Sequence, residues 1–214
     1  MKIAIFDLDG TLLNTIADLA AAANHALGAL GFPRRAEEEC VQFVGNGVTK
    51  LLERALPDGD KTAENIERMR GAFFKYYDEH LWDKTTVYSG VTELLETLQS
   101  RGVLLAVASN KYQSATQRLV KHFFPQINFL EVLGQREGFP VKPDPDIVNE
   151  IMLSAGVRKE AVLYVGDSDV DMQTAKNAGV RVCAVTWGFR SRELLESFRP
   201  DLIADTACEI LTMI

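Results

Sequence analysis

The chain is poor in cysteine, and it lacks long hydrophobic runs and strongly basic segments. Its three cysteines, Cys40, Cys183 and Cys208, show no Cys-x-x-Cys spacing. A zinc site or a disulfide framework is therefore not expected. We expect instead that the cysteines are buried thiols in a reducing compartment. No stretch approaches the roughly 18 consecutive apolar residues of a membrane-spanning helix, and the N-terminus shows no charged-then-apolar leader. These absences predict a cytoplasmic protein without a membrane partner.

Positive charge is also scarce, since the net charge is −7 and no run of Lys or Arg exceeds two residues. Nucleic-acid-binding proteins usually carry a basic patch, so no nucleic-acid partner is expected. An anionic substrate would need local help from lysine, backbone amides or a metal ion. With 214 residues, 47% of them hydrophobic, the chain is long enough for one large domain, or for one domain with an insert.

The most informative segment is Asp7-Leu8-Asp9-Gly10-Thr11, which directly follows an apolar run over residues 3–6. That run is typical of a buried parallel strand, so Asp7 is expected at a strand's carboxyl end, where open α/β sheets place their chemistry. Asp9 points the same way, because side chains alternate along a strand. Two carboxylates so placed repel each other and require a cation or a shared proton. From these residues alone, an Asp-rich turn that caps a helix is the alternative.

Helical periodicity dominates residues 14–82, whereas helices alternate with apolar strands in the rest of the chain. Helices are expected near 15–30, 36–44, 48–56 and 61–80, and later near 91–100, 112–122, 143–155 and 169–178. Further strands are expected near 103–108, 128–132, 161–165 and 180–185. The alternation indicates βαβ units. We predict an α/β fold, with a three-layer Rossmann-like parallel-sheet core of residues 1–13 and 83–214 and a helical insert of residues 14–82 after the first strand.

Polar residues follow the later strands at points where they could reach one crevice. Ser109 and Asn110 come between an apolar run and a helix N-terminus, which is a natural anion cradle. Lys142 lies in a proline-rich turn before the next helix. Residues 166–171, Gly-Asp-Ser-Asp-Val-Asp, supply three carboxylates after another strand. Each could singly be a helix cap or a surface residue, but their joint occurrence at strand ends indicates one site.

In order and spacing, these segments resemble the four motifs of the haloacid dehalogenase-like hydrolases over essentially the whole chain. The motifs are carried by Asp7 to Thr11, Ser109, Lys142 and residues 166–171. The helical insert resembles the cap of that superfamily. Three further segments are similar to the phosphoglycolate phosphatase branch: Val44-Gly45-Asn46-Gly47-Val48, Leu52-Glu53-Arg54-Ala55 and Trp187-Gly188-Phe189.

The resemblance implies a Mg²⁺-dependent phosphomonoester hydrolase that works through an aspartyl-phosphate. Asp7 would be the nucleophile, and Asp9 would protonate the leaving alcohol and then activate water. Ser109 and Lys142 would neutralise the phosphoryl oxygens.

The resemblance also implies the metal and substrate contacts. Mg²⁺ would be held by the Asp7 carboxylate, the Asp9 backbone carbonyl and Asp167, with Asp171 behind them orienting ligands or Lys142. The substrate is expected to be a small phosphorylated metabolite such as 2-phosphoglycolate. The residues expected to bind it are Thr11, Gly45, Asn46, Gly47 and Asn110.

Two other functions remain open at this stage. A sugar phosphomutase of the same superfamily keeps both aspartates and a similar cap, although the Gly45–Gly47 loop favours a phosphatase. A non-catalytic regulator could bind a phosphorylated ligand, although retention of every motif residue argues against it. Dehalogenation and phosphonate hydrolysis are disfavoured, because those relatives do not use an acid at the Asp9 position. Asn14 stands where the family commonly has Asp, which affects expected hinge or cap contacts, and the chain is expected to be a monomer or a homodimer.

Overall fold

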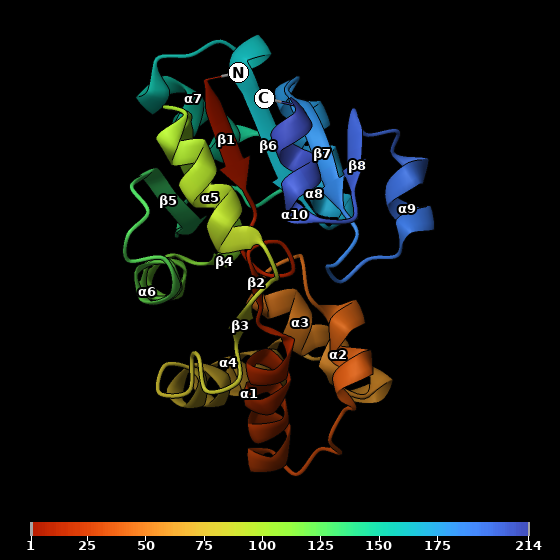
Figure 1. Cartoon of the computed structure of the whole chain (residues 1–214). Coiled ribbons are helices and arrows are strands. Elements are labelled where there is room, and N and C mark those ends of the chain that lie inside the picture. The colour runs from red at the N-terminus through yellow and green to blue at the C-terminus, as the bar shows by residue number, and fades with distance from the viewer. Residues whose placement is uncertain (1, 214) are drawn as a thin grey trace. The chain divides into compact units, whose positions relative to one another are not determined.

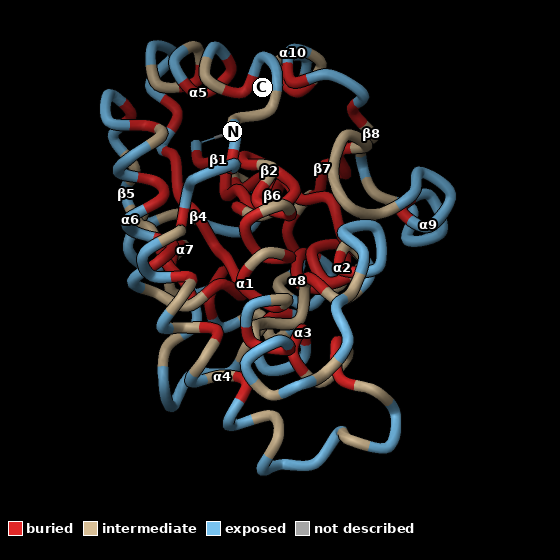
Figure 2. Tube along the Cα trace, turned by 90° about the horizontal axis from the view of Figure 1, so that it is seen from below, coloured by how far each residue is buried: buried red, intermediate tan, exposed pale blue. Residues whose placement is uncertain are grey.

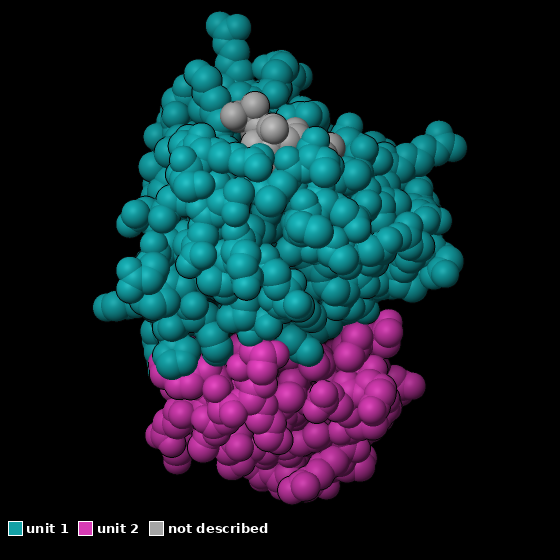
Figure 3. Space-filling view, viewed as in Figure 1, with its two compact units in different colours: residues 1–14, 87–214 teal, residues 15–86 magenta. Residues whose placement is uncertain are grey.

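The computed structural model describes residues 2–213 and divides into two compact units (Figure 3). One unit comprises Met1–Asn14 with Val87–Ile214, and the other comprises Thr15–Thr86. The first boundary follows Asn14, one residue later than the expected boundary after residue 13. The second follows Thr86, four residues later than the expected boundary after residue 82. The action of the second unit as a cap remains a prediction.

The larger unit is built on a six-stranded sheet in the order β5-β4-β1-β6-β7-β8, and its neighbouring strands run parallel (Figure 1). Figure 2 shows buried backbone along β1, β4, β6 and β7, as expected for apolar strands covered on both faces. The strands are β1 (Ile3–Phe6), β4 (Leu104–Tyr112), β5 (Phe129–Gln135), β6 (Val162–Gly166), β7 (Arg181–Val185) and β8 (Leu202–Ala204).

Helices cover both faces of this sheet, so the predicted three-layer α/β core is confirmed. On one face, side chains of β1, β4 and β6 form a hydrophobic cluster with α7, α8 and α9. Figure 1 shows α5 and α10 across the opposite face. The helices are α5 (Val91–Ser100), α6 (Gln113–Phe123), α7 (Asp146–Ala155), α8 (Asp169–Ala178), α9 (Arg192–Ser197) and α10 (Ala207–Ile210).

The smaller unit is helical, and its buried face is apolar. Leu27, Leu52, Met69 and Phe73 are fully buried, one or two from each of three helices, as the 3.6-residue periodicity of the segment requires. The helices are α1 (Ile16–Ala29), α2 (Glu37–Phe43), α3 (Val48–Ala55) and α4 (Ala63–Tyr77).

The carboxylate of Asp18 links the beginning and the end of the chain segment that forms the smaller unit. This side chain lies in the first turn of α1 and is 2% exposed. It accepts hydrogen bonds from the backbone N–H groups of Lys84 and Thr85 and from the Thr85 hydroxyl, at 2.7 to 3.1 Å. A buried carboxylate is stable there because several donors replace its water shell.

Several short elements were not predicted from the sequence. They are β2 (Leu13–Asn14) and β3 (Thr86–Val87), which pair at the two chain connections, together with β8, α9 and α10. Each is too short to develop a readable hydrophobic period. In addition, β4 continues through Ser109, Asn110 and Lys111, so these residues belong to the end of the strand and not to a turn after it.

The expectation of buried thiols holds for two of the three cysteines. Cys40 and Cys183 are buried, but Cys208 is exposed in the short helix α10, so the expectation was wrong there. None of the helices in the described part of the chain, residues 2–213, has both the length and the apolar character that crossing a membrane requires.

Candidate active site

The candidate site lies at the carboxyl ends of three adjacent strands. The strand order places β4 on one side of β1 and β6 on the other, which makes β1 the point where the chain reverses its direction across the sheet. In open α/β sheets this switch point is where ligands bind. Asp7 follows β1 and Asp167 follows β6, as their positions after apolar runs predicted, whereas Ser109 lies within β4 near its end.

Lys142 is the centre of the buried polar cluster. Its ammonium Nζ lies 2.7 Å from Asp171 Oδ1, 3.1 Å from Asp7 Oδ1 and 2.9 Å from the carbonyl oxygen of Ala108. The hydroxyl of Tyr164 is a fourth neighbour, at 3.0 Å. Burial alone would lower the pKa of Lys142, but the charges of Asp171 and Asp7 outweigh burial and hold that pKa well above its usual value. The two carboxylates therefore favour the charged form of Lys142.

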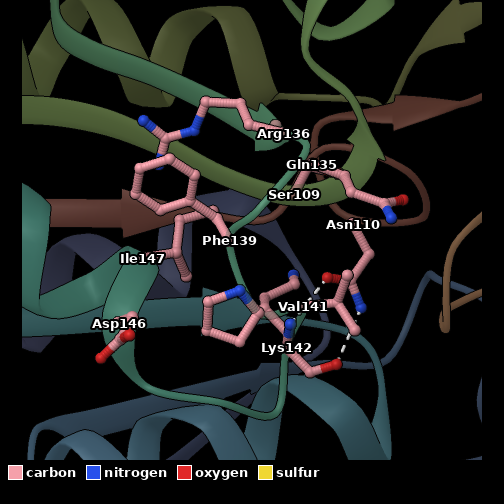
Figure 4. Close-up of a pocket in the computed structure, with 11 residues that line it drawn as sticks. Ser109, Asn110, Gln135, Arg136, Phe139, Val141, Lys142, Asp146 and Ile147 are labelled. Atoms are coloured by element: carbon pink, nitrogen blue, oxygen red, sulfur yellow. Dashed lines mark hydrogen bonds between the residues drawn. The ribbon is translucent and has the colours of Figure 1, made fainter.

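The side chain of Asn110 holds the backbone of Lys142. Its Nδ2 donates to the Lys142 carbonyl at 3.0 Å, and its Oδ1 accepts from the Lys142 N–H at 2.8 Å. Figure 4 shows both bonds beside a small pocket lined by Ser109 of β4 and by Phe139 and other residues of the loop before α7. Substrate contact by Asn110 stays a prediction, and in the structure its side-chain amide binds the backbone of Lys142.

Asp7 and Asp167 are crowded, buried carboxylates. Burial, reinforced by the charge of Asp171, raises the pKa of Asp7 to about 8 and that of Asp167 to about 7. Lys142 opposes the rise at Asp7, and hydrogen bonds from Phe189 N at 2.7 Å and the Thr11 hydroxyl at 2.9 Å oppose it at Asp167. One ammonium does not neutralise the negative charge that these carboxylates would carry together.

This donor set fits a divalent cation. Oxygen atoms of Asp7, Asp167 and Asp171 lie within 4.8 Å of one another, and carboxylate oxygens are the ligands that Mg²⁺ prefers. Gly10 and Gly188 pack directly against the side chain of Asp167. A Cβ at either position would overlap with that side chain. The absence of side chains at those two positions thus keeps Asp167 in place beside Asp7.

Asp171 is satisfied by the protein on both of its oxygens. Oδ1 accepts from Lys142 and from the Tyr164 hydroxyl at 3.0 Å, and Oδ2 accepts from the backbone N–H and hydroxyl of Ser168 at 3.1 and 2.6 Å. Ser168 in turn caps α8 by accepting from the Asp171 N–H. The carboxylate is thus fixed at the start of a helix, facing the lysine.

Asp9 pairs with a lysine that sequence reasoning did not select. Lys111 Nζ lies 3.1 and 3.0 Å from the two Asp9 oxygens, and its side chain is 3% exposed. Lys111 directly follows Ser109 and Asn110 in the chain. Its position next to Ser109 and Asn110 was the only sign in the sequence that Lys111 could belong to the site. The pairing itself could not be predicted, because Asp9 is 102 positions away in the sequence.

The predicted residues Gly45, Asn46 and Gly47 lie in the smaller unit, between α2 and α3. Gly45 and Gly47 have φ values of +120° and +82°, conformations that favour glycine. Arg54 of α3 supports this loop, donating to the Phe43 carbonyl and to Asn46 Oδ1 at 2.9 and 2.8 Å. The loop is therefore well defined within its own unit.

The parallel sheet defines the chain as a Rossmann-like α/β protein, and a buried cluster of carboxylates and one lysine lies at the switch point of that sheet. The model of the family described as haloacid dehalogenase-like hydrolase matches residues 4–185. The chain belongs to this family, as its motifs indicated, and it is an enzyme of the phosphatase kind.

Curated relatives and solved structures place the chain within this family. It is 34% identical to the phosphoglycolate phosphatase of Vibrio parahaemolyticus over 220 residues, covering 100% of this chain and 96% of the relative. It is 33% identical to that of Haemophilus influenzae, covering 100% of this chain and 98% of the relative. A predicted phosphoglycolate phosphatase from Haemophilus somnus has a solved structure that superimposes with a TM-score of 0.93 at 32% identity, covering 100% and 97% of the two chains.

Proposed function

We propose that this phosphatase is a Mg²⁺-dependent phosphomonoester hydrolase that acts through an aspartyl-phosphate on Asp7, with 2-phosphoglycolate as its substrate. One contact supports the chemistry most directly: the Lys142 ammonium lies 3.1 Å from Asp7 Oδ1 at the end of β1, two residues before Asp9. The names of the curated relatives support the choice of substrate.

Asp7 attacks the phosphorus atom in the first step. The new bond joins an Asp7 oxygen to phosphorus, and the bond from phosphorus to the ester oxygen breaks. Asp7 Oδ1 accepts a hydrogen bond from the backbone N–H of Leu8 at 2.7 Å and also contacts the Lys142 ammonium. These two contacts fix the rotamer of the nucleophile. Holding a nucleophile in its attacking position removes entropy from the barrier.

Asp9 moves the protons of both steps. In the first step its carboxylic acid gives a proton to the leaving oxygen, which departs as an alcohol. In the second step its carboxylate takes a proton from water as the water attacks phosphorus, and the phosphorus–oxygen bond to Asp7 breaks. Inorganic phosphate leaves and the Asp7 carboxylate is restored.

Mg²⁺ would be held by the Asp7 carboxylate, the Asp9 backbone carbonyl and Asp167. When bound, it offsets the negative charge of the carboxylates and of the phosphoryl group. Asp171, whose two oxygens accept protein hydrogen bonds, orients Lys142. This division of tasks agrees with the one or two carboxylates that usually meet Mg²⁺ directly.

Ser109 and Lys142 would receive the phosphoryl oxygens. The Ser109 hydroxyl accepts from Lys111 N at 3.3 Å, and its own hydrogen is suited to a phosphoryl oxygen. Lys142 has three N–H groups and four oxygen neighbours, so it would share its longest contact, the one to Asp7, with the phosphoryl group. Such donors stabilise the charge that phosphoryl transfer concentrates on these oxygens.

The smaller unit would act as the cap, and its loop Gly45–Gly47 would select the leaving group. Thr11, whose hydroxyl binds Asp167, would contact substrate through its backbone at the turn after β1. The cytoplasmic location and the choice between monomer and homodimer stay predictions.

Phosphate release from a panel of phosphomonoesters, with Mg²⁺ and with EDTA, tests this function. We expect the highest kcat/KM for 2-phosphoglycolate, loss of activity in EDTA and recovery when Mg²⁺ is restored. Full activity without metal would contradict the metal site, and a flat, weak profile would contradict the substrate. Isomerisation of a sugar phosphate without phosphate release would indicate the mutase, and binding without turnover of any ester would indicate the regulator.

A further inference from the structure

The loop that carries Lys142 cannot be fixed by ordinary strand pairing. Residues 136–145 join β5 to α7 and contain three prolines, Pro140, Pro143 and Pro145. Proline has no backbone N–H, so such a segment cannot form a regular ladder with a neighbouring strand. The loop makes local turns instead, from Phe139 N to Arg136 O and from Asp144 N to Val141 O. Lys142 nevertheless has to place its ammonium within about 3 Å of Asp7 to orient it.

The side chain of Asn110 provides the missing pairing. A primary amide carries a donor and an acceptor in one plane, as a peptide group does. Asn110 uses both toward the N–H and the C=O of Lys142, at 2.8 and 3.0 Å, which is the exchange that two residues of an antiparallel ladder make. Both bonds are marked in Figure 4. The amide therefore joins the proline-rich loop to the sheet.

The segment that carries Asn110 is buried and lies at the end of a paired strand. Asn110 lies in β4, whose residues 104–107 pair with β1 and whose Ala108 and Tyr112, on either side of Asn110, pair with β5. The β4–β5 ladder is irregular between Ala108 and Tyr112, and such irregularities re-aim side chains near active sites. Asn110 is 6% exposed and Lys142 is 2% exposed, so water does not compete for these bonds.

We propose that Asn110 is a positioning residue: its amide fixes the backbone of Lys142, and Lys142 in turn orients the nucleophile Asp7. This role rests on the proposed function, because it acts through the attack of Asp7 on phosphorus. It differs from the substrate contact expected of Asn110 from the sequence. The two roles predict opposite kinetic effects, since positioning governs kcat and substrate contact governs KM.

Asn110→Ala and Asn110→Asp test the proposal in the full chain. We expect the alanine variant to lower kcat about 10- to 100-fold, because a displacement of about 1 Å of a positioned group has effects of this size, while KM stays within about threefold. The aspartate variant keeps the acceptor for Lys142 N–H but places an oxygen against Lys142 O where the donor was, so it should also lower kcat. Gln135→Ala is the matched control, because Gln135 lines the same pocket but is exposed and should keep wild-type kinetics.

A second readout does not depend on turnover. Brief labelling with trace acetic anhydride, followed by mass spectrometry, measures the reactivity of individual lysines. Lys142 should be protected in the wild type and in Gln135→Ala and should react faster in both Asn110 variants, with the exposed Lys50 as an internal reference. If the wild type hydrolyses no phosphate ester, the proposed function fails, and the labelling alone decides on Asn110.

Two results would overturn the positioning role. One is a rise in KM with an unchanged kcat, which would return Asn110 to direct substrate contact. The other is unchanged protection of Lys142 in both variants. If Asn110→Ala fails to fold, the aspartate variant, which has nearly the same size, decides by the same two measurements.

Discussion

Lys111 and Asp9 form a partly buried ion pair across 102 positions of sequence, with Nζ 3.0 and 3.1 Å from the two carboxylate oxygens. Their side chains are 3% and 13% exposed. The pair joins the end of β4 to the turn after β1. Because Asp9 is the proposed proton carrier, Lys111 defines where that carboxyl group lies when substrate arrives.

Replacing Lys111 by Met should therefore impair proton transfer more than phosphorus attack. An alkoxide needs protonation to leave, whereas 4-nitrophenolate is a stable leaving group. We expect Lys111→Met to lower kcat about 10-fold or more for 2-phosphoglycolate and distinctly less for 4-nitrophenyl phosphate, with partial recovery in Lys111→Arg. Equal losses on both substrates would show that Lys111 does not act through Asp9.

The acidic cluster should make the stability of the metal-free protein depend on pH. The pKa values of Asp7 and Asp167 rise from 3.8 to about 8 and about 7 on folding, chiefly through burial. At pH values between the unfolded pKa of 3.8 and these raised pKa values, the folded protein holds more protons than the unfolded chain. The free energy of unfolding therefore falls as pH rises. The contribution of these groups is complete below about pH 4 and is lost as pH passes through 7 and 8.

In EDTA, the Tm should accordingly fall between about pH 6 and pH 8.5. Mg²⁺ should raise the Tm more at the higher pH, where both carboxylates are ionised and ready to bind it. Asp167→Asn should flatten this dependence, whereas Asp169→Asn, at a half-exposed neighbour that pairs with Arg190, should leave it unchanged. A Tm that rises over the range in EDTA would contradict the crowding of the two carboxylates.

The hydroxyl of Tyr164 should contribute to both stability and rate. It lies 3.0 Å from both Lys142 Nζ and Asp171 Oδ1 and is fully buried. Tyr164→Phe keeps the ring but leaves these groups short of a partner, so we expect a loss of about 1 to 3 kcal/mol in the free energy of unfolding and a lower kcat. Tyr76→Phe is the control, because Tyr76 stacks through its ring on His25 and His80. Its change should stay within about 0.5 kcal/mol, and denaturant titration of both variants measures the difference.

Only Cys208 should react with thiol reagents in the folded protein. Burial raises the pKa of Cys40 to about 11 and that of Cys183 to about 12, so both remain thiols at neutral pH and are inaccessible as well. Iodoacetamide with peptide mapping should find label on exposed Cys208 alone, and on all three cysteines in urea. Label on Cys40 or Cys183 without denaturant would show that its unit opens.

The strand ends could be predicted because β1 and β6 are short apolar runs followed at once by acidic residues. The same signal located Asp7 and Asp167, whereas Ser109 was found as a polar residue after an apolar run, which ended the predicted strand before the actual end of β4. The partners of these residues could not be predicted, because a pattern along the chain carries no information on contacts across it. Tyr164 illustrates the limit, since its sequence position is that of another apolar strand residue while its hydroxyl binds Lys142.

The helical segments of the smaller unit were likewise readable from their periodicity. What could not be read was the support of the Gly45–Gly47 loop by Arg54, or the closure of the unit by Asp18. Both are single side chains that bind backbone atoms, and such contacts leave no period in a sequence. Elements of two to four residues, such as β2, β8 and α10, leave none either.

Trapping the covalent intermediate tests the role of Asp7 most directly. Asp9→Asn should still be phosphorylated by 4-nitrophenyl phosphate with Mg²⁺, because that leaving group needs no acid, but it should be slow to hydrolyse the aspartyl-phosphate. We predict a burst of one 4-nitrophenolate per protein molecule and a phosphoryl group mapped to Asp7 by mass spectrometry after acid quench. Neither should occur in Asp7→Asn/Asp9→Asn. A burst that survives in the double variant, or a phosphoryl group on another residue, would contradict Asp7 as the nucleophile.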